Sequence, residues 1–156
     1  MTPDDMAKMA TELFEKGFHC SQATFYCGLK KLGIEDGEDT IAALSPFGGG
    51  IASTGNTCGT ILGAIAVIGY LYGKKRPEDK DGKLMWKLSH KLFKAFEEIT
   101  AEYGGTNCRD IARVNWSDMN EVKKFRTDPL SRRKECFKVI EKTARALGEL
   151  LEQNQL

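Results

Sequence analysis

The sequence predicts an all-α protein, a compact bundle of five to seven helices that residues 1–156 form as a single domain. Three observations lead to this prediction. Apolar residues recur every three or four positions, as they do on the buried face of a helix. Residues that start or stop helices stand at the ends of these stretches. No strand-like alternation is longer than four residues, and a chain of this length can bury a core without disulfide bonds.

The sequence of the N-terminal half predicts four helices, each with a residue that typically starts or ends a helix. Thr2 caps the first helix, Pro3 occupies its first position, and Gly17 ends it. Asn56 or Thr57 caps the fourth helix. The predicted segments are residues 2–16, 20–32, 38–44 and, after a glycine-rich stretch, about 57–72.

The middle of the chain predicts a charged surface loop and then a long helix. The loop covers residues 74–83, KKRPEDKDGK. The helix is expected to begin near Pro77 or Lys80 and to reach Tyr103, because apolar residues follow one another there at helical spacing.

The C-terminal part predicts short helical segments followed by one long helix. Asn107 caps a short helix that begins at Cys108, and Ser117 is a candidate cap for a second short turn. The last helix follows Ser131 and ends near Glu152.

Composition and charge exclude several classes of protein. The net charge is +1, which offers no basic face for nucleic acid. The most apolar run, residues 61–72, is shorter than the roughly 20 residues that span a bilayer. The first residues, MTPDDMAKMATELF, are too charged for a signal peptide. We therefore expect a cytoplasmic protein without membrane insertion, in a compartment where thiols stay reduced.

The five cysteines are the most informative residues for chemistry. They form no CxxC pair, so no local zinc knuckle is expected. Three of them, Cys20, Cys58 and Cys108, fall at predicted helix starts, where unpaired N–H groups lower the pKa of a thiol and favour the thiolate. Cys136 lies about one turn into the last helix, whereas Cys27 is expected to pack in the core.

The glycine-rich stretch FGGGIASTGNTCGTILG, residues 47–63, first suggests a nucleotide-binding loop. Asn56 stands where a phosphate-binding loop has lysine, so nucleotide binding is not expected. Gly59 and Gly63 lie four residues apart and would let another backbone approach the helix. Residues 48–50, all glycine, suggest a main chain with positive φ or one held tightly against a neighbour.

The two histidines give weaker evidence for chemistry than the cysteines do. His19 is adjacent to Cys20 and could tune or protonate that thiol, although a purely structural role is the commoner one for such a residue. His90 is expected at the surface.

The order of these motifs resembles a known family, the redox-active proteins labelled C_GCAxxG_C_C by their cysteine pattern. The similarity rests on GFHCSQA (residues 17–23), FGGGI (47–51), CGTILGA (58–64), Cys108 and Cys136. The resemblance implies that the family's four cysteines are Cys20, Cys58, Cys108 and Cys136, with Cys27 as an extra. A related region occurs beside haem-binding segments in some cytochromes, but this chain has no C-x-x-C-H, so no covalent haem is expected.

Residues and resemblance together predict a small redox protein with one sulfur site. Four cysteines from separate helices would bind an iron–sulfur cluster or another metal, zinc included, for electron transfer or redox sensing. Glycine backbone would approach the sulfurs and donate N–H bonds to them. The residues expected around this cofactor are Gly48, Gly49, Gly50, Asn56 and Gly59.

Two other functions stay open at this point. One is a metal-free thiol–disulfide oxidoreductase, in which two thiols brought together by the fold act in turn. The other is a helical binding module whose cysteines only pack. Whether the protein is an enzyme is left open. A redox partner protein is expected, and apolar faces on the short helices are compatible with a homodimer.

Overall fold

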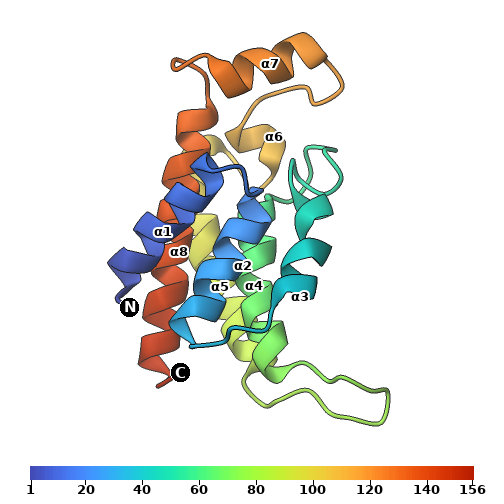
Figure 1. The fold of residues 1–156 in the computed structure, drawn as a ribbon, viewed down its shortest axis with the longest axis vertical. Coiled ribbons are helices and arrows are strands. Elements are labelled where there is room, and N and C mark those ends of the chain that lie inside the picture. The colour runs from blue at the N-terminus through green and yellow to red at the C-terminus, as the bar shows by residue number, and fades with distance from the viewer.

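The computed structural model describes all residues, 1–156, and they form a helical protein without strands (Figure 1). It has eight α-helices and two short 3₁₀ turns, so the all-α prediction is confirmed and the predicted number of five to seven helices is slightly too small. The number is larger because each short segment that the sequence suggested, near Glu38, Cys108 and Ser117, forms a separate helix. The elements are α1 (Pro3–Glu15), α2 (Cys20–Lys31), α3 (Glu38–Ala43), η1 (Ser45–Phe47), α4 (Gly59–Tyr72), α5 (Met85–Thr100), η2 (Ala101–Tyr103), α6 (Cys108–Ile111), α7 (Met119–Thr127) and α8 (Arg133–Gln153).

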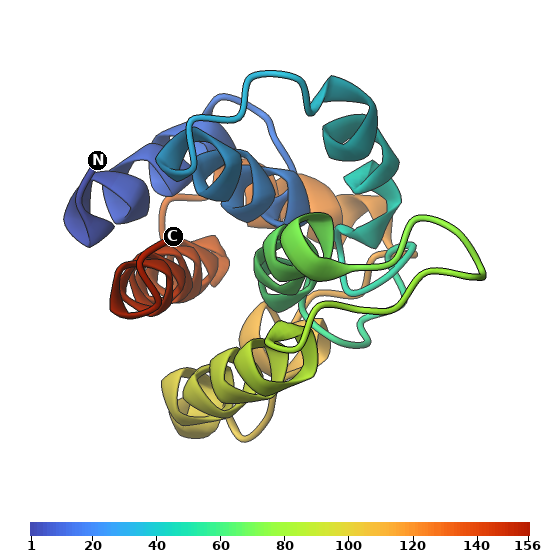
Figure 2. The same cartoon turned by 90° about the horizontal axis from the view of Figure 1, so that it is seen from below.

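Five of the helices form a bundle around one hydrophobic core. In the view along the helices, α4 lies between α2 and α5, while α8 lies beside α1 and α5 (Figure 2). The core is a cluster of 22 buried residues, which we call the bundle core. Its largest fully buried side chains include Phe25, Phe96 and Ile61. Burial of such side chains contributes about 1.5–3 kcal/mol each, which makes this core the main source of stability.

Helices α2 and α4 approach one another closely because glycine stands at their contact. Any side chain at Gly63 would overlap the carbonyl oxygen of Ser21 and the hydroxyl of Thr24. The same Thr24 hydroxyl donates a hydrogen bond of 3.0 Å to the carbonyl oxygen of Thr60 on α4. The predicted use of Gly63 as a packing residue is therefore confirmed.

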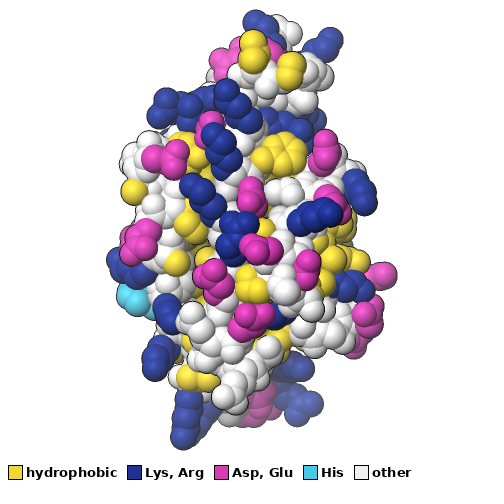
Figure 3. Space-filling model, turned by 90° about the vertical axis from the view of Figure 1, so that its left-hand side faces the viewer, with side chains coloured by type: hydrophobic (Ala, Val, Ile, Leu, Met, Phe, Trp, Pro, Cys, Tyr) yellow, Lys and Arg dark blue, Asp and Glu magenta, His cyan; other side chains and the backbone are white.

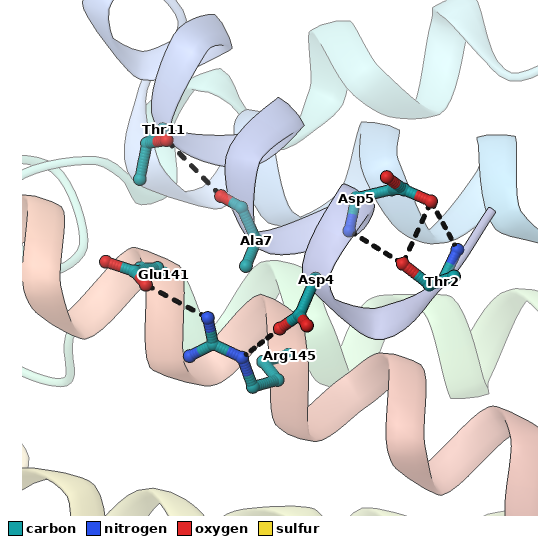
Figure 4. A network of polar contacts seen from close by, with 7 residues as sticks. All are labelled: Thr2, Asp4, Asp5, Ala7, Thr11, Glu141 and Arg145. Atoms are coloured by element: carbon teal, nitrogen blue, oxygen red, sulfur yellow. Dashed lines mark hydrogen bonds and ion pairs between the residues drawn. The ribbon is translucent and has the colours of Figure 1, made fainter.

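The start of α1 agrees with the sequence in detail, and a polar network ties this helix to α8 (Figure 4). Thr2 caps the helix through its hydroxyl, which accepts from the amide of Asp5 at 3.1 Å. Arg145 of α8 donates to Asp4 at 2.7 Å and to Glu141 at 3.0 Å. These charged groups are largely exposed, so such pairs contribute less than about 1 kcal/mol each and orient the helices more than they stabilise them.

Three predicted helix starts are wrong. Helix α4 is capped by Cys58, after both residues that the sequence suggested. Helix α5 begins at Met85, because the chain before it forms a loop in which the amide of Gly82 donates to Tyr72. Helix α7 is capped by Asp118 in place of Ser117, since the Asp118 carboxylate accepts from two amides of the first turn.

The glycine-rich loop between η1 and α4 has an unusual backbone. Residues 49–53 all have positive φ, and three of them, Ile51, Ala52 and Ser53, are not glycine. The predicted positive φ is confirmed at Gly49 and Gly50, whereas Gly48 is extended with φ −63°. A left-handed conformation costs L-residues roughly 1–2 kcal/mol each. The loop therefore stores strain that the rest of the structure has to hold.

The upper end of the bundle carries a separate layer, which we call the cap. It consists of the loop of residues 48–57 together with α6 and α7, and α7 lies across the end of the bundle (Figure 1). Its own buried cluster contains only Cys108, Ala112 and Phe125. No helix of the structure combines the length and the apolar character that crossing a membrane would require.

Candidate functional site: a cavity lined by four cysteines

One large cavity lies where the cap meets the bundle. Its volume is about 900 Å³ and its wall includes the thiols of four cysteines, each from a different helix. These are the four cysteines that the sequence singled out: Cys20, Cys58, Cys108 and Cys136. The fold therefore brings together residues that lie up to 116 positions apart in the chain.

Three of the four cysteines lie at helix starts, as predicted. Cys20 is the first residue of α2, Cys58 is the residue that caps α4, and Cys108 is the first residue of α6. Cys136 is the fourth residue of α8 and is half-buried. All five cysteines of the chain are free thiols.

Cys27 does not belong to this group. It is fully buried in the bundle core, and its thiol donates to the carbonyl oxygen of Thr24 at 3.2 Å. Burial raises the pKa of the Cys27 thiol to about 12, which keeps it protonated. The prediction that Cys27 packs in the core is confirmed.

Backbone pairing holds the starts of α4 and α6 side by side. Thr57 and Asn107 form an antiparallel bridge, flanked by two hydrogen bonds. The amide of Cys58 donates to the carbonyl oxygen of Thr106 at 3.1 Å, and the amide of Cys108 donates to that of Asn56 at 2.7 Å. This pairing fixes the spacing between the main chains of Cys58 and Cys108 without any contribution from their sulfurs.

Asn56 has a structural role in this arrangement. Its side chain accepts a hydrogen bond from the guanidinium of Arg109, which also donates to the carbonyl oxygen of Gly55 at 2.9 Å. Asn56 does not line the cavity and does not cap α4, so its predicted capping role is wrong. The contacts of Asn56 instead attach the glycine-rich loop to α6.

The predicted glycines lie against the cysteines and their neighbours. A side-chain carbon at Gly59 would lie 2.8 Å from the sulfur of Cys20, and one at Gly50 would lie 2.6 Å from Cβ of Cys108. One at Gly48 would lie 2.9 Å from Nδ1 of His19. Gly48 and Gly49 line the cavity itself, whereas Gly50 and Gly59 stand behind the cysteines. A larger residue at Gly59 would displace the thiol of Cys20, and one at Gly50 would displace the side chain of Cys108.

Cys20 and Cys58 are direct neighbours, and this contact shifts their pKa values in opposite directions. The pKa of the Cys58 thiol is lowered to about 7, first because the Cys20 thiol donates to it and then because Thr60 and Ile61 at the start of α4 do so. The pKa of Cys20 is raised well above its ordinary value, since the same hydrogen bond requires its proton and burial disfavours its charge. The pair thus favours one thiolate next to one thiol.

Of the other two thiols of the cavity, Cys108 does not follow the sequence prediction, whereas Cys136 lies inside its helix and was not expected to have a lowered pKa. Burial raises the pKa of Cys108 to about 11, although this residue begins a helix. Burial also raises the pKa of Cys136, and the charges of Cys58 and Cys108 raise it further. The expectation that each helix start lowers a thiol pKa therefore holds for Cys58 and is wrong for Cys20 and Cys108. The four-residue α6 is too short to offset the loss of solvent.

Sequence reasoning missed many residues of the cavity wall, and three of them matter for its chemistry: Trp116, Arg126 and Arg133. The indole nitrogen of Trp116 is buried and has no hydrogen-bond partner, but it lies near enough to Cys108 for its N–H to oppose the rise in that thiol's pKa. Neither arginine forms an ion pair, and no aspartate or glutamate lines the cavity. No local sequence signal marks these residues, because they come from three different segments, the loop before α7, α7 itself and the first turn of α8, which only the fold brings together.

The two histidines lie in different places, one at the cavity and one at the surface. His19 lies on the cavity wall directly before Cys20, and its backbone amide donates to Gln22 at 3.1 Å. His90 is exposed on α5. Neither histidine belongs to a cluster of three or more metal-ligating side chains close enough to hold a metal ion, and no such cluster is found elsewhere in the chain. The four thiols therefore surround a space and do not meet at one point.

Comparison with known proteins agrees with the cysteine pattern. A family model described as "Putative redox-active protein (C_GCAxxG_C_C)" matches residues 18–150. No curated protein and no solved structure matches the chain. The matched segment begins just before Cys20, reaches the last turns of α8 and includes all four cavity cysteines. The chain therefore belongs to the C_GCAxxG_C_C family of redox-active proteins.

Proposed function

We propose that this redox protein binds an iron–sulfur cluster in the cavity and uses it for electron transfer or redox sensing. The observation that supports the proposal is the convergence of four thiols, from four helices, on the wall of one cavity. Four thiolates are the usual ligand set of [2Fe–2S] and [4Fe–4S] clusters. When bound, such a cluster would supply one-electron chemistry that thiols alone do not perform. Five free thiols suit a reducing compartment, and we place the protein in the cytoplasm.

The wall of the cavity fits a sulfur-rich, negatively charged group. The unpartnered N–H of Trp116 is a donor of the kind that cluster sulfurs accept. Arg126 and Arg133 would offset the charge of thiolates, and no carboxylate opposes them. The lack of a side chain at Gly59 leaves space for the sulfur of Cys20. The chain's contribution is thus to hold four sulfurs apart and to donate hydrogen bonds.

We propose a cluster in preference to a single zinc ion. A zinc ion needs its ligands about 2.0–2.3 Å from one point, and no three candidate ligands of this chain are grouped in that way. A cluster of several iron atoms is wider than one ion and is held by more widely spaced thiols. Each charged thiol of the cavity still acts on the pKa of others, so the four lie within one electrostatic neighbourhood.

Anaerobic preparation of the protein with iron and a reductant tests this proposal. We expect visible absorbance and roughly stoichiometric iron and acid-labile sulfide. Serine variants of Cys20, Cys58, Cys108 and Cys136, made one at a time, should each lose or strongly reduce this signal. Cys27→Ser is the matched control and should retain it, because Cys27 lies outside the cavity. A colourless, iron-free protein, or one that takes up a single zinc ion, would rule the cluster out.

A second candidate function is favoured by the contact between Cys20 and Cys58. Two adjacent thiols, one of them with a pKa lowered to about 7, are the arrangement of a metal-free thiol–disulfide oxidoreductase. In that case the thiolate of Cys58 would attack a disulfide of the substrate, form a mixed disulfide and release the first half of the substrate as a thiolate. Cys20 would then lose its proton and attack the sulfur of Cys58, which forms a Cys20–Cys58 disulfide and releases the second half as a thiol.

The cysteine variants separate the two functions. A dithiol protein loses two titratable thiols on mild oxidation, and Cys108→Ser or Cys136→Ser leaves that loss intact. A cluster protein needs all four residues. A protein whose cysteines only pack shows neither the cluster nor the paired loss of thiols.

A further inference from the structure

A strongly basic segment runs from the second half of α7 into the first turn of α8. Residues 122–134 contain six cationic residues and a single acid, Asp128. This segment therefore carries a charge of +5, while the whole chain carries +1, so the remaining residues together carry −4. The expectation of no basic face, drawn from the net charge alone, is thus wrong, because the small total hides an uneven distribution of charge. We call the six residues the basic collar: Lys123, Lys124, Arg126, Arg132, Arg133 and Lys134.

The collar is not used to hold the fold together by ion pairs. The salt bridges of the structure involve lysines and arginines of other segments, and none includes a residue of the collar. Lys123, Lys124 and Lys134 are exposed. Helix α7 is held to the rest of the protein through Val122 and Phe125, the only residues of this helix that are buried.

The collar adjoins the cysteine cavity. Arg126 and Arg133 form part of the cavity wall, and the guanidinium of Arg133 lies 4.8 Å from the ring centre of Phe14. In the space-filling view, lysine and arginine side chains gather over the upper part of the molecule, around α7 and the beginning of α8 (Figure 3). Farther down the same face, acidic and basic side chains are mixed.

An apolar residue stands within this charged surface. Leu130, in the turn that joins α7 to α8, is 82% exposed. A surface leucine alone needs no explanation. An exposed apolar residue among cations, beside a redox site, has the composition of a docking surface for a partner of opposite charge, with an apolar contact inside a polar rim.

We propose that the basic collar docks an acidic redox protein, which exchanges electrons with the cysteine site; this inference rests on the redox function proposed above. Two arginines of the collar, Arg126 and Arg133, lie on the cavity wall, whereas its three exposed lysines do not. The three exposed lysines add a field that reaches into solvent, where it steers an acidic protein towards the side of the molecule on which the four thiols lie. Such steering raises association rates by about 10–10³-fold and weakens as salt is added.

The test uses two triple variants with the same change of charge. The collar variant is Lys123→Glu, Lys124→Glu and Lys134→Glu, which leaves the residues of the cavity wall untouched. The control variant is Lys75→Glu, Lys80→Glu and Lys83→Glu. Its lysines are exposed in the loop between α4 and α5, at the opposite end of the bundle (Figure 1). Circular dichroism and thermal unfolding would first show that both variants fold.

Two measurements are made on each protein. The first is the affinity for a fluorescently labelled, strongly acidic [2Fe–2S] ferredoxin, followed by anisotropy at low and at moderate salt. The second is the second-order rate of electron transfer with that ferredoxin, beside the rate with a small neutral mediator. We expect the collar variant to lose about tenfold or more in both affinity and ferredoxin rate, and to lose most of the salt dependence. The control variant should change by less than about twofold, and the mediator rate should change in neither variant.

Several results would overturn the docking surface. Equal losses of affinity and of electron-transfer rate in the collar and control variants would show an effect of net charge alone. Binding of a DNA duplex that matches the ferredoxin in affinity and in dependence on the collar would show a surface for any polyanion. Failure of the neutral mediator to exchange electrons with the unmodified protein would instead count against the proposed redox function, while the anisotropy experiment would still decide whether the collar binds the acidic protein.

Discussion

The bundle core and the cap are held together in different ways, although they meet at the same cavity. The bundle core has 22 buried residues, among them fully buried aromatic side chains, and its helices have ordinary backbone conformations. The cap has a buried cluster of three residues and a loop in which residues 49–53 all have positive φ. The stability of the fold therefore comes chiefly from the bundle, whereas the cap depends on it.

The cysteines lie at the boundary between these two regions. Cys58 belongs to the bundle core and Cys108 to the cluster of the cap, while Cys136 packs against both. Because the two regions are held together differently, we expect mutations in the bundle to act mainly on folding and mutations in the cap to act mainly on the site.

The largest difference is expected between two phenylalanines. Phe96→Ala in the bundle core should lower the free energy of unfolding by about 3–5 kcal/mol, because Phe96 is fully buried in a well-packed environment. Phe125→Ala in the cap should cost less than about half as much, since its cluster is small and can open locally. Urea denaturation monitored by circular dichroism measures both values. Equal losses would show that the cap is as integral to folding as the bundle.

Two glycines of α4 provide a sharper contrast within one helix. Gly63→Ala should lower the free energy of unfolding by about 1–3 kcal/mol, because the added carbon would overlap the backbone of α2. Gly69→Ala should leave stability unchanged or raise it by up to about 1 kcal/mol, since nothing lies within 4 Å of the added carbon and alanine favours a helix. Thermal unfolding of the two variants would show whether their stabilities change in opposite directions. A loss at both positions would contradict the close α2–α4 contact as the cause.

The contact between Cys20 and Cys58 predicts a dependence on pH at the site. In the reduced, metal-free protein, thiolate absorbance should rise with a midpoint near pH 7, because the pKa of Cys58 is lowered to about 7 from an ordinary 9. The stabilising effect of this thiolate on the fold is present above pH 9 and is lost as the pH falls through 7. The raised pKa of Cys20 acts in the opposite direction at high pH, so the net change in stability is smaller than either shift alone.

Removal of one partner tests the origin of this shift. Cys20→Ala should move the midpoint of Cys58 upwards, towards that of an ordinary thiol, because the first cause of the lowering is lost. Cys27→Ala, a change in the bundle core, should leave the midpoint in place. A midpoint near pH 7 in the Cys20→Ala protein would assign the shift to the start of α4 alone.

The smallest effect concerns the strained loop of the cap. Ile51→Gly should raise the free energy of unfolding by up to about 1 kcal/mol, because glycine adopts the positive φ of this position, 64°, without the penalty of a β-branched side chain. Ala66→Gly in α4 should lower the free energy of unfolding by about 0.5–1 kcal/mol, because glycine in a helix loses more backbone conformational entropy on folding than alanine does. Destabilisation by Ile51→Gly would mean that the packing of Ile51 outweighs its strain.

The sequence by itself determined the helical class, most helix ends and the cysteines that belong together. Periodic apolar residues and capping residues act over short distances along the chain, so α1, α2 and the helix starts at Cys20 and Cys108 could be predicted with little error. Gly63 was predicted correctly for the same reason, because a small residue at helical spacing has few other uses.

Only the tertiary structure decided how the cavity is completed and charged. Trp116 precedes α7, Arg126 lies in α7 and Arg133 begins α8, and no local pattern encodes that these three segments meet at the cavity wall. Asn56 attaches a loop to α6 in place of capping α4, since the backbone pairing of residues 56–58 with 106–108 moves the start of that helix to Cys58. Thiol pKa values depend on burial and on neighbouring sulfurs, both of which arise from residues distant in the sequence. For that reason the sequence could name the four thiols but not the one among them that favours its charged form.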